Sequence, residues 1–246
     1  MIRWRILADS LDAIRRADPA FGFRGARIDL SDGVGPDAGD DIVAFARLPG
    51  SNARLIPNPY LLRGRRWLAP PRSWERKSDA VYFRGSSTGS PNFDANSRVA
   101  LCRLAKAIPR ADCRLSRIKQ VDAEFSRRLA ADGLVGARHP LFWLDRHRYL
   151  VDTDGNSSSW DRYLLIGHYG GVPIRFESVW QECWHDVLVD GGNCVLADRQ
   201  TLAATVDRLR ANPAAARAIA ASAGRTVAEH LSRPALLGRL AESLGG

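Results

Sequence analysis

Short apolar runs and amphipathic stretches alternate along the chain, and this pattern predicts strands alternating with helices. Continuous apolar runs between turn residues are typical of strands that are covered on both faces of a parallel sheet. The predicted strands span residues 26–30, 40–48, 80–83, 113–118, 149–151, 172–176 and 194–196. The predicted helices span residues 10–17, 98–107, 121–131, 179–187, 200–210 and 213–230, with a last helix opening at 232–234. The alternation predicts an α/β fold with a parallel sheet, whose ligands bind beyond the carboxyl ends of the strands.

Prolines and other helix-breaking residues divide this pattern into two parts. The prolines within residues 56–60 predict an extended segment, and the prolines, tryptophans and arginines of residues 64–76 indicate an irregular linker. We therefore expect a domain boundary near Ser78, with a reduced N-terminal α/β lobe over residues 1–78. Residues 79–232 are expected to form the main domain, and residues 233–246 a C-terminal helix that packs back.

The stretch from His147 to Leu165 predicts a buried strand, a sharp turn and the start of a helix. Asp154-Gly155-Asn156 is a typical turn sequence, and the three serines that follow offer oxygens to cap a helix beginning near Trp160. A helix N-terminus at the carboxyl end of a strand attracts phosphate, because free N–H groups and the helix dipole point at it. The turn lacks the glycine-rich fingerprints of dinucleotide and P-loop proteins, so the alternative is a plain connection.

A second strand exit strengthens the phosphate interpretation. Phe83-Arg84-Gly85-Ser86 leaves one predicted strand, and Arg98 follows in the first turn of a helix that Ser97 is expected to cap. If both strands belong to one sheet, their exits share an edge, and Arg84 and Arg98 supply planar donors to a phosphate held by the serine-rich turn. This arrangement predicts a diphosphate site. The alternatives are a surface ion pair for Arg84 and a solvated helix face for Arg98.

Composition and charge narrow the function classes. The 246 residues carry a net charge of +9, almost all of it from arginine. This charge suits a phosphorylated substrate, nucleic acid or an anionic membrane face, although a genome rich in G and C explains part of the arginine excess. Four cysteines, ten or more residues apart, disfavour zinc and redox motifs. No leader pattern and no apolar run of roughly 18 residues is present, so we expect a soluble, cytoplasmic protein, at most peripherally attached to an anionic membrane.

Several motifs together resemble glycosyltransferase family 90, which includes protein O-glucosyltransferases, fungal capsule xylosyltransferases and bacterial lipopolysaccharide-modifying transferases. The resemblance covers residues 28–232 and is strongest over residues 81–86, with Arg98 downstream, and over residues 147–159. Further matching segments are 28–33, 56–60, 174–178 and 180–184, followed by a helix pair ending in residues 220–231.

The family implies a GT-B-like fold with a Rossmann-like donor domain, a UDP-sugar donor, and no metal or other cofactor. The residues assigned to the nucleotide-sugar site are Arg84, Gly85, Ser86, Arg98, Gly155, Asn156, Ser157, Ser158, Ser159, Trp160, Arg162 and Glu177. The resemblance implies that Ser86 and Arg98 contact the diphosphate and that the Gly155–Trp160 backbone holds it. Arg162 departs from the family pattern by one residue, which rotates a helical side chain by about 100°. Glu177 stands where GT-B enzymes place a ribose-binding carboxylate, and a solvated turn glutamate is the alternative.

The resemblance also implies a catalytic base. Asp32 matches the family's aspartate on a loop of the first lobe, which takes the proton of the acceptor hydroxyl as its oxygen attacks the anomeric carbon and inverts it. The alternative is a turn-forming aspartate, and the competing carboxylates nearby are Asp29, Asp37, Asp40 and Asp41. Because residues 1–78 are few for a complete Rossmann-like half, we expect acceptor binding to be reduced or shared with a partner.

Other motifs carry less weight. Asp152-Thr153-Asp154 has the form of the metal-binding Asp-x-Asp of GT-A transferases, but the Gly-Asn after it indicates that the strand has ended, so we expect no metal there. The histidines at positions 139, 147 and 185 are too scattered for a metal site. Trp180 and Trp184 have helical spacing, which favours a helix core over a sugar platform.

The sequence therefore predicts an inverting glycosyltransferase that moves a sugar from a UDP-sugar to a hydroxyl of a cell-surface glycan or lipopolysaccharide. One alternative is a degenerate transferase that binds a nucleotide-sugar without turning it over. Another is a basic module that binds an anionic surface or nucleic acid. Arginines are spread over the whole chain, which disfavours the basic module, so no nucleic-acid partner is expected.

Overall fold

A computed structural model describes residues 2–22, 25–63 and 68–245, which fold into two compact units. The smaller unit comprises Met1–Trp67, Val179–Val187 and Val227–Gly246, and the larger unit comprises Leu68–Ser178 and Leu188–Thr226. The smaller unit thus includes residues 179–187 and 227–232, which the sequence pattern assigned to the main domain. The functional roles of the two units stay predictions. Among the helices of the described residues, none combines the length and the apolarity needed to cross a membrane.

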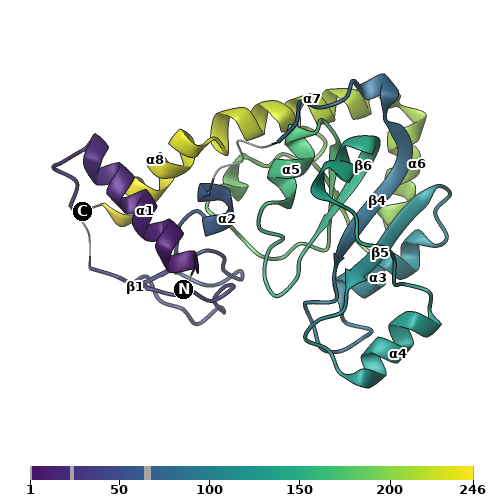
Figure 1. Ribbon diagram of the computed structural model, residues 1–246, viewed down its shortest axis with the longest axis horizontal. Coiled ribbons are helices and arrows are strands. Elements are labelled where there is room, and N and C mark those ends of the chain that lie inside the picture. The colour runs from purple at the N-terminus through teal and green to yellow at the C-terminus, as the bar shows by residue number, and fades with distance from the viewer. Residues whose placement is uncertain (1, 23–24, 64–67, 246) are drawn as a thin grey trace. The chain divides into compact units, whose positions relative to one another are not determined.

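The larger unit is built on a five-stranded sheet whose strands all run parallel, and Figure 1 shows β5, β4 and β6 beside one another. Its strands are β4 (Ser78–Ser86), β5 (Ala111–Arg117), β6 (His147–Thr153), β7 (Val172–Phe176) and β8 (Val195–Ala197). Its helices are α3 (Ser97–Ala105), α4 (Ala123–Ala131), α5 (Arg162–His168), α6 (Leu202–Ala211) and the first part of α7 (Pro213–His230). Short 3₁₀ turns lie at Trp74–Arg76 and Leu141–Arg146.

The strand order β5-β4-β6-β7-β8 creates a switch point between β4 and β6. From β4 the chain crosses to β5 on one side, and it then returns to β6 on the other side. In doubly wound sheets, ligands bind in the crevice beyond the carboxyl ends of the strands at such a point. Because β4 ends at Ser86 and β6 at Thr153, both predicted loops leave the sheet here.

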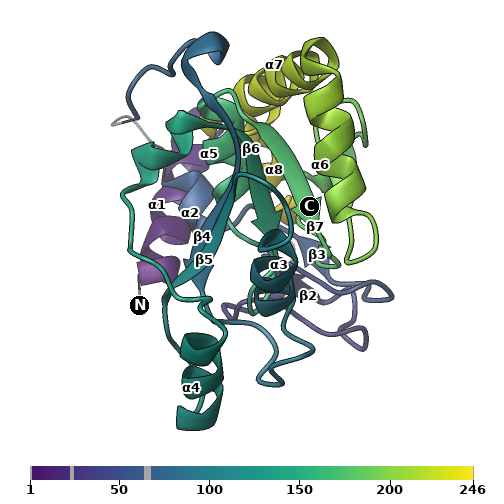
Figure 2. The same ribbon diagram turned by 90° about the vertical axis from the view of Figure 1, so that its right-hand side faces the viewer.

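Apolar side chains cover both faces of this sheet, which is why its strands read as continuous apolar runs. One face packs on α3, α4, α6 and α7 through a core that includes Phe83, Val99 and Val206. Tyr82 and Leu150, which alternate with core residues along their strands, are buried on the opposite face. Figure 2 shows α5 on one side of the sheet and α3 and α6 on the other. All residues of β7 are buried.

The smaller unit contains a three-stranded parallel sheet in the order β1-β2-β3. Its strands are β1 (Arg27–Ile28), β2 (Ile42–Ala44) and β3 (Arg54–Leu55), and its helices are α1 (Ile2–Ala17), α2 (Pro59–Leu62) and α8 (Arg233–Leu244). The three helices pack against one another, with Leu7 and Leu240 fully buried. An antiparallel bridge between Arg47 and Gln181 joins residues 179–187 to this unit.

The structure confirms the α/β class and all the predicted strands, with ends that differ by several residues. Two helix starts are corrected. α1 begins at Ile2 rather than Ser10, so Ser10 lies inside the helix, where its hydroxyl donates to Ile6 O at 2.8 Å. α3 is capped by the side chain of Asn96 rather than by Ser97.

The predicted helix at residues 179–187 is wrong. The segment holds a single 3₁₀ turn at His185–Val187, and Gln181 pairs with Arg47. Trp184 is buried as expected, but its indole N–H donates to the Glu182 carboxylate at 3.1 Å. Pairing with a distant segment therefore overrides the helical spacing of the tryptophans.

The segments with prolines also differ from expectation. Residues 56–58 precede α2, but Pro59 begins this helix and the Asn58 side chain caps it, as suits proline in a first turn. Residues 64–67 of the predicted linker lie outside the described residues.

Candidate functional site

Arg98 lies at the switch point, where the loops after β4 and β6 meet. Its backbone is in the first turn of α3, two residues after the capping Asn96. Its Nε donates to Asp154 O at 2.9 Å, and its Nη1 donates to Ser86 Oγ at 2.9 Å and to Thr88 Oγ1 at 2.8 Å. The two strand exits thus meet as predicted, and the guanidinium joins them.

A side chain at Gly155 would collide with this guanidinium. A Cβ there would lie 2.6 Å from Arg98 Nη2 and 3.0 Å from Thr88 Oγ1. The N–H of Gly89 donates to Asn156 Oδ1 at 3.2 Å, which ties the same two loops together a second time. A side chain at position 155 would therefore force the guanidinium to shift from its place against the backbone of the turn after β6.

A second arginine, Arg162, is held at the same edge of the sheet. It opens α5, donates from Nη2 to Arg84 O at 2.8 Å, and lies over the Phe83 ring at 4.9 Å from the centroid. Its Nε is buried and has no hydrogen-bond partner within the residues described. The Arg162 side chain therefore packs on β4, and its contact with a nucleotide-sugar stays a prediction.

The two arginines form a positive cluster that the charges of Asp152 and Asp154 offset only in part. Burial, and next the charge of Arg162, lower the pKa of Arg98 to about 10, and burial lowers the pKa of Arg162. In the described part of the chain, neither forms an ion pair with a carboxylate. The carboxylates whose charges act on Arg98 are those of Asp152 and Asp154. Asp152 forms an ion pair with Arg175 at 3.1 Å, and Asp154 accepts a hydrogen bond from a serine hydroxyl at 2.8 Å. An anion at this edge would offset the cost of burying these charges.

The serine-rich turn differs from the prediction at its helix start. α5 begins at Arg162, and Trp160 before it has a φ of +67°, so residues 157–159 lie in the turn. The N–H of Gly155 donates to Ser157 O at 2.7 Å and closes this turn. The Ser157 hydroxyl is buried and finds no partner among the described residues. The predicted capping by Ser157, Ser158 and Ser159 is therefore wrong, and contact between this turn and a diphosphate stays a prediction.

Arg84 and Gly85 have structural uses. Arg84 Nη2 donates to both carboxylate oxygens of Asp112, at 2.8 and 2.7 Å, while Nε and Nη1 donate to three backbone carbonyls. All five N–H donors are used, which favours the ion pair over the phosphate contact. A Cβ at Gly85 would lie 2.5 Å from the Phe83 ring, so glycine is needed there for packing within the strand.

Glu177 follows β7 at the same edge of the sheet. Thr153 of β6 pairs with Phe176 of β7, so Glu177 lies level with Asp154. Its φ of +46° is unusual for a residue with a side chain and often marks functional positions. Its carboxylate accepts from Arg199 Nε at 2.8 Å. The predicted ribose contact stays a prediction.

Asp32 belongs to the smaller unit. It lies in the loop after β1 and forms an ion pair with Arg3 of α1. Two competing aspartates are also bonded: Asp41 pairs with Arg27 at 2.7 Å, and Asp29 accepts a backbone N–H in a local turn. The catalytic role of Asp32 stays a prediction.

Sequence reasoning missed two residues of the site, Thr88 and Asn96. Thr88 Oγ1 contacts Ser86 Oγ at 2.9 Å as well as the guanidinium of Arg98. Asn96 is fully buried, caps α3, and donates from Nδ2 to two carbonyls of the loop after β4, at 3.2 and 2.9 Å. Asparagine directly before a helical run is a capping signal, and it was available in the sequence.

The other candidate motifs serve the fold. β6 ends at Thr153, as the Gly-Asn sequence after Asp154 indicated. His147 stacks on Tyr82 at 4.4 Å between ring centroids, and His139 stacks on the same ring at 6.0 Å. Across the residues that the structure describes, no three His, Cys, Asp or Glu side chains gather as around a metal ion. The metal-free donor site stays a prediction.

Comparison with known proteins supports the architecture. No known family profile and no curated protein sequence matches this chain. Among solved structures, a glycosyltransferase from Rickettsia africae ESF-5 aligns with a TM-score of 0.52 and 13% identity, over 82% of this chain and 56% of that one. A variant of S. aureus TarM in complex with fondaparinux, α-GlcNAc-glycerol and UDP aligns with a TM-score of 0.51 and 10% identity, over 72% of this chain and 38% of that one.

These similarities confirm the predicted Rossmann-like GT-B fold. At 10% and 13% identity they show the fold alone, and membership of family 90 stays a prediction. The chain spans 56% of the Rickettsia protein and 38% of TarM.

Proposed function

We propose that this protein is a glycosyltransferase that binds a UDP-sugar at the switch point and moves the sugar to a hydroxyl of a glycan. The observation that carries the proposal is the pair of buried Arg98 and half-buried Arg162, neither of which forms an ion pair with a carboxylate within the described residues. Buried cations without a counter-ion are costly, and a diphosphate would supply the negative charge. TarM, which shares the fold, was crystallised with UDP, and this supports a uridine nucleotide.

The arginines would act on the leaving group. During transfer, the bond between the anomeric carbon and the UDP oxygen breaks, and UDP leaves with the electron pair. Negative charge grows on the diphosphate, so donors held in place by Ser86, Thr88 and Asp154 would stabilise the transition state most. In metal-dependent transferases a divalent cation neutralises this charge. Two arginines in that role support a metal-independent donor site with no cofactor besides the donor substrate.

The proposal assigns the acceptor chemistry to Asp32. Its carboxylate would take the proton from the acceptor hydroxyl while that oxygen attacks the anomeric carbon opposite UDP, which inverts the configuration. The resemblance to family 90 supports this role and supports a cell-surface glycan or lipopolysaccharide as acceptor. The proposed location is the cytoplasm, and the net charge of +9 supports work beside an anionic membrane surface.

One observation favours a second candidate, a protein that binds a nucleotide-sugar without turning it over. Asp32 forms an ion pair with Arg3, and this pair engages the carboxylate that would have to contact the acceptor hydroxyl. In this second candidate, the donor site keeps its arginines and binds UDP, but transfer does not follow.

The donor site is tested by titrating the protein with UDP in the presence of EDTA, using isothermal calorimetry. We expect binding, and we expect Arg98→Met to weaken it about 10- to 150-fold, because a charge-assisted hydrogen bond to phosphate contributes roughly 1.5–3 kcal/mol. Arg103→Met is the matched control. Arg103 lies on the same helix, but its guanidinium pairs with Asp94 and Asp132 on the surface, so UDP affinity should not change.

Because Arg98 also holds two loops together, each variant is checked by thermal unfolding. Arg98→Lys retains the charge without the planar fork and should bind UDP with intermediate affinity. Binding that requires manganese would contradict the metal-free version. Equal UDP affinity in the wild type and a folded Arg98→Met variant would remove Arg98 from the site and leave the proposal without its support.

A further inference from the structure

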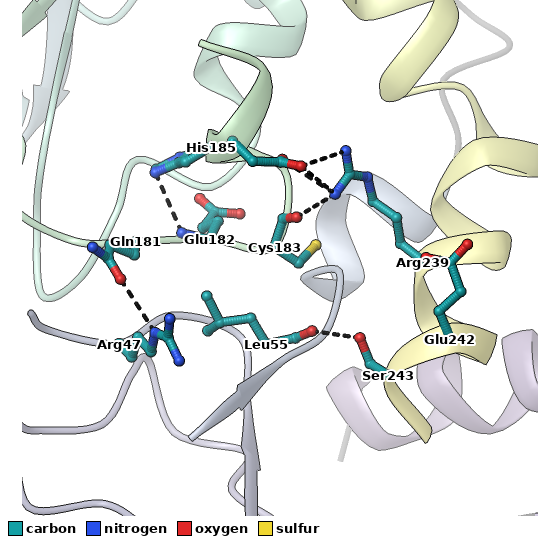
Figure 3. A pocket seen from close by; sticks show the side chains of 10 residues that line it. Arg47, Leu55, Gln181, Glu182, Cys183, His185, Arg239, Glu242 and Ser243 are labelled. Atoms are coloured by element: carbon teal, nitrogen blue, oxygen red, sulfur yellow. Dashed lines mark hydrogen bonds and ion pairs between the residues drawn. The ribbon is translucent and has the colours of Figure 1, made fainter. Parts of the chain in front are cut away.

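The smaller unit contains a pocket of about 490 Å³, within the range of small-molecule sites (Figure 3). Its walls come from three segments that are distant in sequence. Arg47 and Leu55 lie on one side, residues 181–186 form a second wall, and Arg239, Glu242 and Ser243 of α8 form the third.

Hydrogen bonds fix these walls before any ligand arrives. Arg47 and Gln181 exchange backbone hydrogen bonds of 3.0 and 2.9 Å, and Arg47 Nε also donates to Gln181 Oε1 at 3.2 Å. On the α8 side, the Ser243 hydroxyl donates to Leu55 O at 2.8 Å, and Arg239 Nη1 donates to Cys183 O at 2.6 Å. The pocket is therefore preformed, which lowers the cost of binding a ligand.

Several polar groups of the lining have hydrogen-bonding capacity left. Arg47 uses Nε and one N–H of Nη1, so its Nη2 group retains two donors. Glu242 has no ion pair or hydrogen bond to any side chain that the structure describes, so its carboxylate can accept. Gln181 accepts through its oxygen and retains its amide N–H₂ donors. Donors and an acceptor thus stand around one cavity.

The net charge of the side chains that line the pocket indicates which class of ligand it can bind. Two arginines, Arg47 and Arg239, stand against three carboxylates, Glu182, Asp186 and Glu242, which leaves 2 − 3 = −1 with histidine neutral. The balance is opposite to that of the arginine cluster in the larger unit, so a phosphate or nucleotide is disfavoured here. A neutral polyhydroxyl ligand fits, because each hydroxyl both donates to a carboxylate and accepts from a guanidinium or amide.

We infer that this pocket binds a neutral sugar, and that this sugar belongs to the acceptor glycan. The assignment of the sugar to the acceptor rests on the proposed function, whereas sugar binding itself rests on the lining alone. Glu242 and Arg47 are the residues that hold the sugar hydroxyls.

The probes are glucose, galactose, mannose, N-acetylglucosamine and their disaccharides, measured by saturation-transfer NMR and calorimetry on the full chain. Glu242→Ala is expected to weaken the binding of the best sugar about tenfold or more, since a hydrogen bond to a charged group is lost. Glu229→Ala, which removes an exposed carboxylate beyond the pocket lining, should leave it unchanged. Arg47→Met should likewise weaken sugar binding. Its control is Arg233→Met, at a residue outside the pocket lining, which should leave sugar binding unchanged. UDP affinity is measured on every variant and should stay constant.

The outcomes separate the two proposals. If UDP binds but none of these sugars does, or if Glu242→Ala and Glu229→Ala bind sugar equally, the pocket assignment is overturned while the donor site stands. If a sugar binds in a Glu242-dependent way and UDP does not bind, sugar binding stands and the transferase proposal fails. Binding of inorganic phosphate at this pocket, lost in Arg47→Met, would also overturn the assignment of a neutral ligand.

Discussion

Single residues set the energetics of the donor site. Arg98 is 8% exposed and forms its hydrogen bonds to neutral oxygens, including Asp154 O and Thr88 Oγ1. Those bonds satisfy part of the guanidinium, but none of them is an ion pair with a carboxylate. The Arg98 guanidinium also lies against Gly155, in the space that a side chain at position 155 would occupy. The site therefore combines a buried guanidinium that has no carboxylate ion pair within the described residues with a glycine whose Cβ would meet it.

Gly155→Ala should destabilise the protein and weaken UDP binding together. The new methyl group would meet Arg98 Nη2 at 2.6 Å, and the buried guanidinium is held by its hydrogen bonds, so overpacking of about 1–3 kcal/mol is expected. Urea unfolding measures the loss, and Gly35→Ala is the control, since a Cβ at Gly35 meets nothing within 4 Å. Equal unfolding midpoints for the two variants would show that Arg98 moves aside freely.

At the scale of secondary-structure elements, the start of α3 and the ends of β4, β6 and β7 position the candidate donor site. The side chain of Asn96 caps α3 and holds the loop after β4, and the first turn of α3 then places Arg98 between β4 and β6. One buried amide thus links a helix N-terminus to a strand exit. On the neighbouring strands, the pairing of Thr153 with Phe176 brings Glu177 to the same level.

Asn96→Ala should cost more than the loss of an ordinary helix cap. It removes the cap, worth about 1 kcal/mol, and leaves two loop carbonyls without their donor, so a total of roughly 2–4 kcal/mol is expected. Asp122→Ala is the matched variant, because Asp122 caps α4 through the Phe125 N–H. We expect that change to cost only about 1 kcal/mol in urea unfolding. Similar costs for both variants would mean that Asn96 contributes only as a cap.

At the scale of the whole molecule, the proposed chemistry is divided between two compact units. The arginine cluster belongs to the larger unit, whereas Asp32 and the pocket beside α8 belong to the smaller one. Residues 179–187 and 227–246 return from the larger unit to the smaller one, so the two units are connected by more than one passage of the chain. Donor binding and proton transfer are therefore separable by mutation.

Asp32→Asn is expected to abolish turnover of a UDP-sugar, including slow hydrolysis, while UDP affinity stays within about twofold, because the amide cannot take a proton. Release of UDP, measured for a panel of UDP-sugars, tests this. Asp29→Asn changes a neighbouring aspartate that serves a local turn, and it should retain most of the activity. Full activity in Asp32→Asn would transfer the role of base to another carboxylate. Binding of UDP without turnover in the wild type would favour the non-catalytic candidate.

Much of the larger unit could be predicted from the sequence, because its central strands are covered on both faces and therefore read as apolar runs. The meeting of the two strand exits was predicted for the same reason, since parallel strands place their carboxyl ends on one edge. The role of Arg84 was not predictable, because its partner Asp112 lies on a neighbouring strand and the sequence does not show which strands pair. The helix expected at residues 179–187 failed for a similar reason, the bridge between Gln181 and Arg47.

Hydrophobic periodicity, turn chemistry and capping residues are local, so the sequence by itself determined the α/β class, the strands of the main sheet and the two loops that leave it. Tertiary structure alone decided which charges are neutralised. It paired Arg84 with Asp112 and Arg175 with Asp152, and it left Arg98 and Arg162 without a carboxylate in the described chain. Whether a charge finds a partner depends on which strands become neighbours and which side chains become buried. These are properties of the folded chain, and the candidate donor site follows from them.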